Sequence, residues 1–381
     1  MNALFSEEEL MLKAAVREFA ERELIPKASG YDKSEEFPWE NIRSLSSMGL
    51  MGLTIPEEFG GASATYSQLM IAEEELARGC ASTSVIHLTH LSLGSECIVR
   101  FGSKIQQETY LPKLASGEYL AAFALTEPSS GSDAADIQTI ASRKEDGYTL
   151  NGSKTFITNG PEADLTVVFA TTNQEKGTHG ISAFLVPKGV TGLTISVQKG
   201  KMGMRASSTA ELFFTDCHLD SKYLLGNEGD GFHIAMSIID SSRMTVAAQA
   251  IGIGQAALEA ALKYANHRKT FGKKLTENQA IQFLLADMAT NLDAARLLTR
   301  RAAQLKDQGE NYTKETAMAK LAAAEAAHYV CDKALQIHGG YGYFNDSVVE
   351  RLYRDQRVTE IYEGTSEIQR LVISRNLLKG L

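Results

Sequence analysis

Apolar side chains recur every three or four positions through the first 120 residues, the spacing that places them on one face of a helix. Ser6 and Glu9 have the spacing of a capping box, and the helix that they open is predicted to reach Pro26. Four more helices are predicted, at residues 39–49, 66–80, 82–101 and 104–116. Residues 1–120 are therefore predicted to form a helical domain.

The period changes from helical to alternating after residue 120. Leu193, Ile195 and Val197 alternate with hydroxyl residues, as in a strand with one buried face, and residues 147–152 have the composition of a hairpin. Short apolar runs with no helix between them follow the same pattern, at residues 165–170, 181–186 and 211–214. We expect residues 121–230 to form a small antiparallel β-barrel or sandwich, and not a Rossmann domain.

Long amphipathic helices return from Gly231. They are predicted at residues 233–266, 281–295, 313–338 and from about 366 onward. Four helices of this kind predict a bundle over residues 231–381. The first contains Gly252-Ile253-Gly254-Gln255-Ala256-Ala257, which matches a dinucleotide-binding pattern, but no strand precedes it. Close packing of helices explains these glycines better.

Composition and charge narrow the class of protein. The chain has 381 residues, 44% hydrophobic and 22% charged, as in a globular protein of two or three domains. Its net charge of -9 and the absence of a basic run disfavour nucleic acid and membranes as partners. Without a targeting pattern or an apolar stretch of about 18 residues, we expect a cytoplasmic protein. The four cysteines form no paired motif, so we expect buried thiols and no metal site.

One acidic residue is a candidate base. Glu363 precedes Gly364, which allows a ligand to approach the backbone, and Ser366 with Gln369 fits a capping box that opens the last helix. The helix N-terminus would stabilise the carboxylate, whereas burial against an apolar ligand would raise its pKa. The alternative is an exposed loop glutamate before a helix.

Four other segments combine glycine with polar or aromatic side chains. Residues 125–133 offer hydroxyls and backbone donors, and residues 156–160 offer an aromatic ring with a threonine beside it. Two cations at 268–272 suit a pyrophosphate, and glycines end a helix at 337–342. Each segment also has a structural explanation, as a capped loop, a core aromatic, cations at a helix C-terminus, or C-cap glycines.

Together and in this order, the five segments resemble the acyl-CoA dehydrogenase family over essentially the whole chain, most closely its short-chain, butyryl-type and short branched-chain members. The matching motifs are LTEPSSGSD (125–133), TFITNG (155–160), RKTFGKKL (268–275), QIHGGYGY (336–343) and IYEGTSEIQR (361–370). The resemblance implies a helical N-terminal domain, an antiparallel β-barrel and a C-terminal four-helix bundle. It also implies FAD, an acyl-CoA substrate, electron-transfer flavoprotein as acceptor, and a homotetramer built as a dimer of dimers.

The resemblance assigns roles to individual residues. The flavin and the thioester would be lined by Phe123, Leu125, Thr126, Gly131 and Ser132, with Phe156 and Thr158 over the flavin ring. The FAD diphosphate and adenosine would be bound by Arg268, Thr270 and Phe271, with Gln336, Ile337, Gly339 and Gly340 from a neighbouring subunit, and Thr365 and Glu367 would complete that site. The substrate would contact Ser132, Asp240, Arg243 and Gly364.

The implied reaction is the α,β-dehydrogenation of a short-chain or short branched-chain acyl-CoA to a trans-2-enoyl-CoA. Glu363 would take the α-proton while the β-hydrogen leaves as a hydride to flavin N5. Long-chain and isovaleryl relatives carry the base at the position of Ser242 here, which favours Glu363 as the only base. A cyclic acyl-CoA, or an oxygen-using flavin oxidase or monooxygenase of the same fold, are the alternatives. The acyl pocket would be lined by residues 85–94, whose His87 and His90 we interpret as surface or satisfied core groups.

Overall fold

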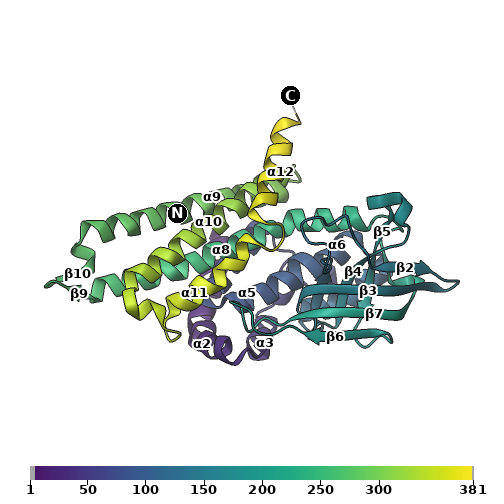
Figure 1. Ribbon diagram of the computed structural model, residues 1–381, viewed down its shortest axis with the longest axis horizontal. Helices are drawn as coiled ribbons and strands as arrows, with labels where there is room; N and C mark the ends of the chain where they lie inside the picture. The colour runs from purple at the N-terminus through teal and green to yellow at the C-terminus, as the bar shows by residue number, and fades with distance from the viewer. Residues whose placement is uncertain (1–4, 380–381) are drawn as a thin grey trace.

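The computed structural model describes residues 5–379, with helices gathered at one end and strands at the other (Figure 1). The first helices are α1 (Glu7–Phe19), α2 (Ile25–Ser34), α3 (Trp39–Ser47), α4 (Tyr66–Gly79), α5 (Ala81–Leu88), α6 (Glu96–Phe101) and α7 (Lys104–Ser116). The capping box predicted at Ser6 is confirmed, because its hydroxyl accepts from the Glu9 N–H at 3.1 Å and its own N–H donates to Glu9 at 2.8 Å.

Two helices differ from their predicted form. The first does not stop at Pro26 but passes through a π-helical turn, Ala20–Leu24, into α2. Pro26 lies in the first turn of α2, where a proline needs no N–H partner. The helix predicted at 82–101 contains a second π-helical segment, Thr89–Ser95, between α5 and α6. Apolar spacing does not reveal such insertions, because they shift the buried face by only part of a turn.

The middle of the chain forms an eight-stranded sheet in the order β6-β7-β3-β2-β4-β5-β8, with β1 beside β4. Its strands are β1 (Ala121–Ala124), β2 (Ile140–Arg143), β3 (Gly147–Thr158), β4 (Leu165–Thr171), β5 (Ile181–Pro187), β6 (Leu193–Val197), β7 (Thr209–Asp220) and β8 (Leu224–Leu225). The predicted wholly antiparallel arrangement is corrected in one respect: β4 pairs in parallel with β1 and β2, so the sheet is mixed. An alternating pattern predicts a strand but does not show whether it pairs in parallel or antiparallel with its neighbour. No hairpin leads into β1 that would indicate its direction.

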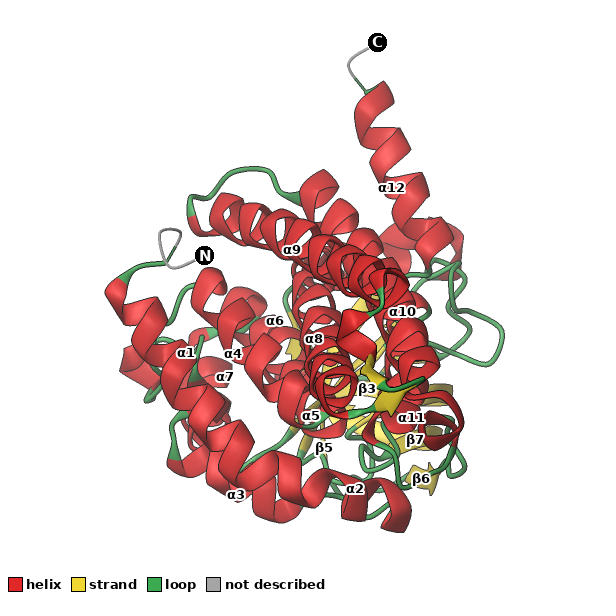
Figure 2. Cartoon of the chain, turned by 90° about the vertical axis from the view of Figure 1, so that its left-hand side faces the viewer, coloured by secondary structure: helices red, strands yellow, loops and turns green. Residues whose placement is uncertain are grey.

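The C-terminal third is helical again. It consists of α8 (Gly231–His267), α9 (Gln279–Asp307), α10 (Thr313–His338), α11 (Val348–Gln356) and α12 (Ser366–Leu378), with a small hairpin, β9 (Lys269–Thr270) and β10 (Lys273–Lys274), between α8 and α9. Figure 2 shows α8, α9 and α10 packed together and α12 projecting from the body. The predicted fold class, two helical domains around a β domain, is confirmed. The domain boundaries stay a prediction. No described helix has both the length and the apolarity to cross a membrane.

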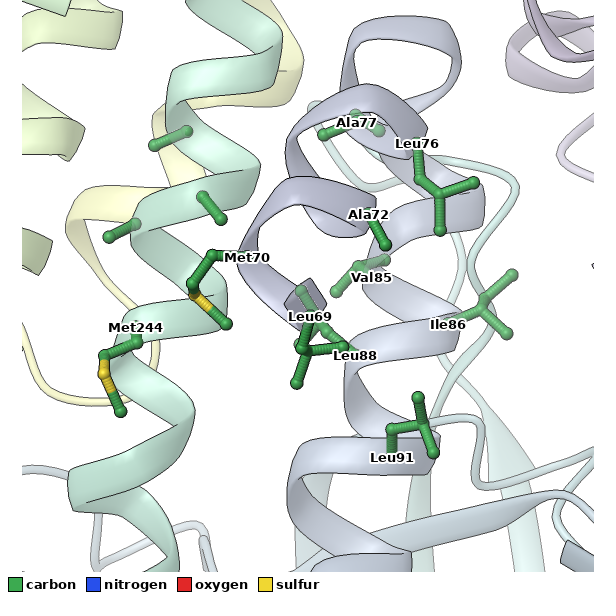
Figure 3. Close-up of a cluster of buried hydrophobic side chains, with 14 of the residues drawn as sticks. Leu69, Met70, Ala72, Leu76, Ala77, Val85, Ile86, Leu88, Leu91 and Met244 are labelled. Atoms are coloured by element: carbon green, nitrogen blue, oxygen red, sulfur yellow. The ribbon is translucent and has the colours of Figure 1, made fainter. Parts of the chain in front are cut away.

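The N-terminal helices and the bundle share one core. In Figure 3, Leu69 and Met70 of α4 and Leu88 of α5 gather beside Met244 of α8, and all four side chains are buried. The four cysteines are buried and free, as predicted.

The glycines of the dinucleotide-like pattern serve this packing. A Cβ atom on Gly252 would lie 2.2 Å from the Glu74 carbonyl oxygen of α4, and one on Gly254 would lie 2.7 Å from a methyl of Leu292. Both glycines lie inside α8, with no strand before them. Close helix packing, rather than phosphate binding, is therefore their role.

We expect Gly252→Ala to lower the melting temperature, because the added methyl overpacks the contact of α8 with α4 at a cost of about 1–3 kcal/mol. The matched control is Gly30→Ala in α2, where an added Cβ meets no atom within 4 Å. That change should raise stability by about 0.5–1 kcal/mol, since alanine loses less backbone entropy in a helix. Thermal denaturation of both variants checks the pair, and equal shifts of the same sign would contradict close packing at Gly252.

Candidate functional site

A cavity of about 580 Å³ opens between the strands, α11 and the loop before α12. Eight of the predicted site residues line it: Thr126, Gly131, Ser132, Phe156, Thr158, Glu363, Gly364 and Thr365. Segments that lie more than 200 residues apart in the sequence therefore meet at one site. We call this space the catalytic cavity.

Phe156 faces the catalytic cavity because β3 is irregular there. The pairing of β3 with β7 shifts register between Lys154 and Ile157, and Phe156 itself has a left-handed φ of 59°. Such a bulge changes the direction in which a side chain points. Its N–H donates to the side chain of Gln198 at 3.2 Å, and its ring is 68% exposed. An exposed aromatic on a cavity wall, with Thr158 beside it, suits a planar ring.

A buried ion pair holds the two segments that carry these groups. Lys154 donates to the Glu127 carboxylate at 2.7 Å and to the Leu125 carbonyl at 3.1 Å, and both charged side chains are almost completely buried. Glu127 also accepts the N–H groups of Gln138 and Thr139. Burial lowers the pKa of Lys154 to about 8. Burial by itself would raise the pKa of Glu127, but the positive charge of Lys154 brings that pKa below its usual value.

Glu363 lies on a strained loop. Its φ is 51° and that of Gly364 is 91°, so two consecutive residues adopt the left-handed conformation. Their carbonyls receive three side-chain donors from three helices. Arg243 Nε of α8 donates to the Glu363 carbonyl at 3.4 Å, and Lys320 Nζ of α10 donates to that of Gly364 at 2.8 Å. Gln369 Nε2 of α12 donates to both carbonyls, at 3.2 and 2.8 Å. We call these three donors the carbonyl clamp.

Glu363 is partly buried, and its carboxyl accepts from the Ser242 hydroxyl where it lines the catalytic cavity. Burial raises its pKa from 4.5 to about 7, while the hydrogen bond donated by Ser242 and the charges of Lys320 and Arg243 act in the opposite direction. A carboxylate with a pKa near neutrality is both ionised enough and basic enough to take a proton from carbon. The alternative of an exposed loop glutamate is wrong.

Arg243 and Asp240 stand beside this loop but do not line the cavity. Arg243 Nη1 donates to Asp240 at 2.6 Å, and Asp240 also accepts from the Thr313 hydroxyl at 3.0 Å. Phe123 is half-buried against Phe169, with ring centres 4.9 Å apart, and Leu125 is buried. The predicted contacts of these four residues with ligand stay predictions.

A second cavity, of about 450 Å³, lies where α8 and α10 end. Five predicted residues line it: Arg268, Thr270, Ile337, Gly339 and Gly340. Phe271, Gln336 and Glu367 are exposed and line neither cavity. One chain therefore does not bring the two groups of predicted cofactor residues together.

Several residues that line the catalytic cavity were not predicted from the sequence. They belong to the segment 201–209, to α11 and to the 3-10 turn Arg357–Glu360 that follows it: Lys201, Met202, Gly203, Met204, Ser207, Thr209, Arg354, Arg357 and Val358. The glycine- and serine-containing run at 200–208 was the one available signal. Lys320 was also missed, since it lies within an ordinary helical pattern. The predicted capping box of Ser366 with Gln369 is wrong, because the N-cap is Thr365, whose hydroxyl accepts from the Ile368 N–H at 3.3 Å, and Gln369 donates instead to the carbonyls of Glu363 and Gly364.

His87 and His90 are satisfied core groups, as interpreted from the sequence. His87 pairs with Glu73 at 2.6 Å and donates to the Leu50 carbonyl at 2.9 Å. Burial acts to lower the pKa of His87, but the Glu73 carboxylate raises it overall. His90 lies 3.1 Å from two backbone carbonyls and accepts the Ala121 N–H, and burial lowers its pKa to about 4.

Known proteins match the chain over nearly its whole length. Family models described as the N-terminal, middle and C-terminal domains of acyl-CoA dehydrogenase match residues 6–118, 122–217 and 229–378. The short-chain specific mitochondrial acyl-CoA dehydrogenase of Rattus norvegicus is 50% identical over 370 residues, covering 97% of this chain and 90% of the relative.

Solved structures agree. Butyryl-CoA dehydrogenase from Megasphaera elsdenii has a TM-score of 0.96 at 41% identity, covering 98% of this chain and 99% of that chain. A structure described as the electron transferring flavoprotein of Acidaminococcus fermentans has a TM-score of 0.97 at 44% identity, with the same coverage.

We expect Lys154→Met to destabilise the protein by about 3–5 kcal/mol, because it leaves the Glu127 charge buried without its partner. The double variant Lys154→Met/Glu127→Gln should recover part of that loss, since no unpaired charge remains. The exposed pair Lys222–Asp220, with a 2.8 Å contact, is the control. Lys222→Met should leave the melting temperature almost unchanged, because a solvent-exposed pair contributes little to stability. Thermal denaturation measures all three, and equal losses at Lys154 and Lys222 would contradict the buried pair's role.

Proposed function

The chain belongs to the acyl-CoA dehydrogenase family, and we propose that it oxidises a short-chain or short branched-chain acyl-CoA to the trans-2-enoyl-CoA with Glu363 as the base. The resemblance drawn from the five motifs is confirmed, and the protein is an oxidoreductase of this family, whose members are FAD-dependent flavoproteins. One observation carries the proposal: Glu363, with a pKa near 7, lines the same cavity as the exposed Phe156.

The residues of the catalytic cavity fit the flavin of FAD. Phe156 offers an uncovered aromatic face, and Thr126 and Thr158 offer hydroxyl groups on the same wall. An added Cβ on Gly131 would meet no atom within 4 Å, so space for a ligand adjoins its backbone. When bound, FAD supplies a hydride acceptor for the β-hydrogen of the substrate.

Glu363 supplies the proton acceptor. An α-proton beside a thioester is too weakly acidic for an ordinary carboxylate in water, so the base must be poorly solvated. The burial that raises its pKa provides this condition, and the carbonyl clamp fixes the backbone from which the carboxylate reaches into the cavity. A substrate that fills the cavity would exclude water further and strengthen both effects.

The preference for a short acyl group rests on the wall behind Glu363. Tyr362 and Val85 line the cavity, and the Tyr362 hydroxyl donates to the side chain of Gln249, which is fully buried. Gln249 is tied in turn to the Ala81 carbonyl, at 3.3 Å, and to Ser84, at 3.4 Å. Moving this hydrogen-bonded wall would leave buried polar groups unpaired, at about 1–3 kcal/mol each. We infer that it limits the length of the acyl chain.

A second copy of the chain would complete the cofactor site. The second cavity holds the predicted diphosphate residues beside β9, and Figure 1 shows β9 and β10 at the opposite end of the molecule from β3, which carries Phe156. Around it, Phe271, Tyr341 and Phe344 are exposed, and the projecting α12 exposes Leu371, Leu377 and Leu378. Apolar surface of this kind is typical of an oligomer interface. We propose a homotetramer, with electron-transfer flavoprotein as the electron acceptor.

The substrate class is tested by anaerobic addition of acyl-CoA thioesters to the yellow holoenzyme. Butyryl-CoA and isobutyryl-CoA should bleach the flavin absorbance, whereas octanoyl-CoA should do so far more slowly because Tyr362 and Gln249 close the cavity. Cyclohexanecarbonyl-CoA tests the cyclic alternative. Absence of bleaching by every thioester would overturn the dehydrogenase proposal, and rapid reoxidation by oxygen would favour an oxidase.

We expect Glu363→Gln to retain FAD and to lose flavin reduction by butyryl-CoA by several orders of magnitude, because the amide is nearly isosteric but accepts no proton. In the unaltered enzyme, the rate constant of flavin reduction should rise with pH through about 7, since only the ionised carboxyl acts as a base. Stopped-flow reduction across pH 5.5–9 measures both. Near-normal reduction in the variant would place the base elsewhere.

A further inference from the structure

Lys320 is a fully buried lysine directly beneath the loop that carries Glu363. Its ammonium group donates to the Gly364 carbonyl at 2.8 Å. Within residues 5–379, no carboxylate lies within 4.0 Å of it, so it has no direct ion pair. Burying an ammonium group costs several kcal/mol, and a neutral carbonyl offsets only part of that. This lysine therefore needs an explanation beyond local packing.

The hydrogen bond by itself does not explain the lysine. Gln369 Nε2 already donates to the same Gly364 carbonyl at 2.8 Å, and it does so without a charge. A neutral amide or an apolar side chain at position 320 would therefore leave that carbonyl satisfied. What Lys320 adds to the carbonyl clamp is a positive charge in a site of low polarity, where charges act over longer distances.

Four charged groups from four surrounding segments act electrostatically on this ammonium. They are Arg243 of α8, Glu360 of the 3-10 turn Arg357–Glu360, Glu363 of the loop, and Glu367 of α12. Burial lowers the pKa of Lys320 to about 8, and among the charges Glu363 opposes this most strongly. Arg243 is engaged by Asp240 at 2.6 Å, and Glu360 by His328 at 2.6 Å. The carboxylate of Glu363 is thus the main charge that Lys320 stabilises.

We propose that Lys320 is a positioning residue for the reaction, and that its charge, rather than its hydrogen bond, keeps the buried Glu363 carboxylate ionised between turnovers. This inference rests on the proposed role of Glu363 as the base. The ammonium acts through its charge and does not line the catalytic cavity. Burial alone would favour a protonated, inactive base, and the charge below the loop counteracts it.

The test compares the pH dependence of flavin reduction by butyryl-CoA in three variants of the holoenzyme. Lys320→Met removes the charge and the hydrogen bond, and Lys320→Gln removes the charge but keeps a donor. Both variants should shift the acidic side of the pH–rate profile, the acid limb, upward by about one pH unit. At pH values below this limb the rate of flavin reduction should therefore fall about tenfold, and at high pH it should recover. The matched control, Gln369→Leu, removes hydrogen bonds to the same loop without removing a charge. It should lower the rate by a similar factor at every pH.

FAD content and melting temperature, measured on each variant, distinguish misfolding from a change in the ionisation of Glu363. Lys320→Gln keeps the test decisive if Lys320→Met does not fold. An unmoved acid limb in both Lys320 variants, or an equal shift in Gln369→Leu, would overturn the proposal. Glu363→Gln distinguishes the two levels of inference. If this variant still reduces flavin, the proposed base and this inference fail together. If it does not reduce flavin, and the acid limb of the Lys320 variants is unmoved, only the role of Lys320 is refuted.

Discussion

The site depends on the close packing of α8 against α4, which fixes the helix that faces the loop of Glu363. Gly252 allows the backbone of α4 to approach to a distance that no side chain would permit. About two and a half to three turns before that contact, α8 presents Ser242 and Arg243, which bond to the carboxylate and to the carbonyl of Glu363. Because a helix is rigid over this distance, packing at one point positions chemistry at the other.

The sequence predicted the parts of the fold that local patterns encode. Helical and alternating spacing separated the three regions, and the capping box at Ser6 located the start of a helix. Strand direction at β1 and the two π-helical segments followed from tertiary contacts instead, and no local signal marks them. Residues with visible motifs, such as Phe156 and Glu363, were found. Lys320 was not, because it reaches the loop from inside a helix whose sequence shows only ordinary amphipathic spacing. Gln369 was predicted to cap the last helix, but its side chain donates to the carbonyls of the loop instead.

The environment of Glu363 balances two opposing requirements. Removing water makes the carboxyl a stronger base, but the same burial favours its protonated form. Ser242, Arg243 and Lys320 supply one hydrogen bond and two positive charges, which limit the rise of the pKa to about 7. Lys154 and Glu127 are also buried charges, in the strand region on the other side of the catalytic cavity. They stabilise each other directly, as an ion pair. Glu127 is thus held in an ion pair, whereas Glu363, the proposed base, forms no ion pair among the described residues.

Three residues with strained backbones lie where the ligands are proposed to bind. Phe156, Met204 and Glu363 all have left-handed φ values and all line the catalytic cavity. Such conformations cost of order 1–3 kcal/mol each and persist only where the surroundings hold them. Each of the three is held by a side chain: Gln198 accepts the N–H of Phe156, Asp355 accepts that of Met204 at 2.5 Å, and the carbonyl clamp engages the loop of Glu363. The strain turns an aromatic face and a carboxylate toward the same space, which regular strands and helices would point elsewhere.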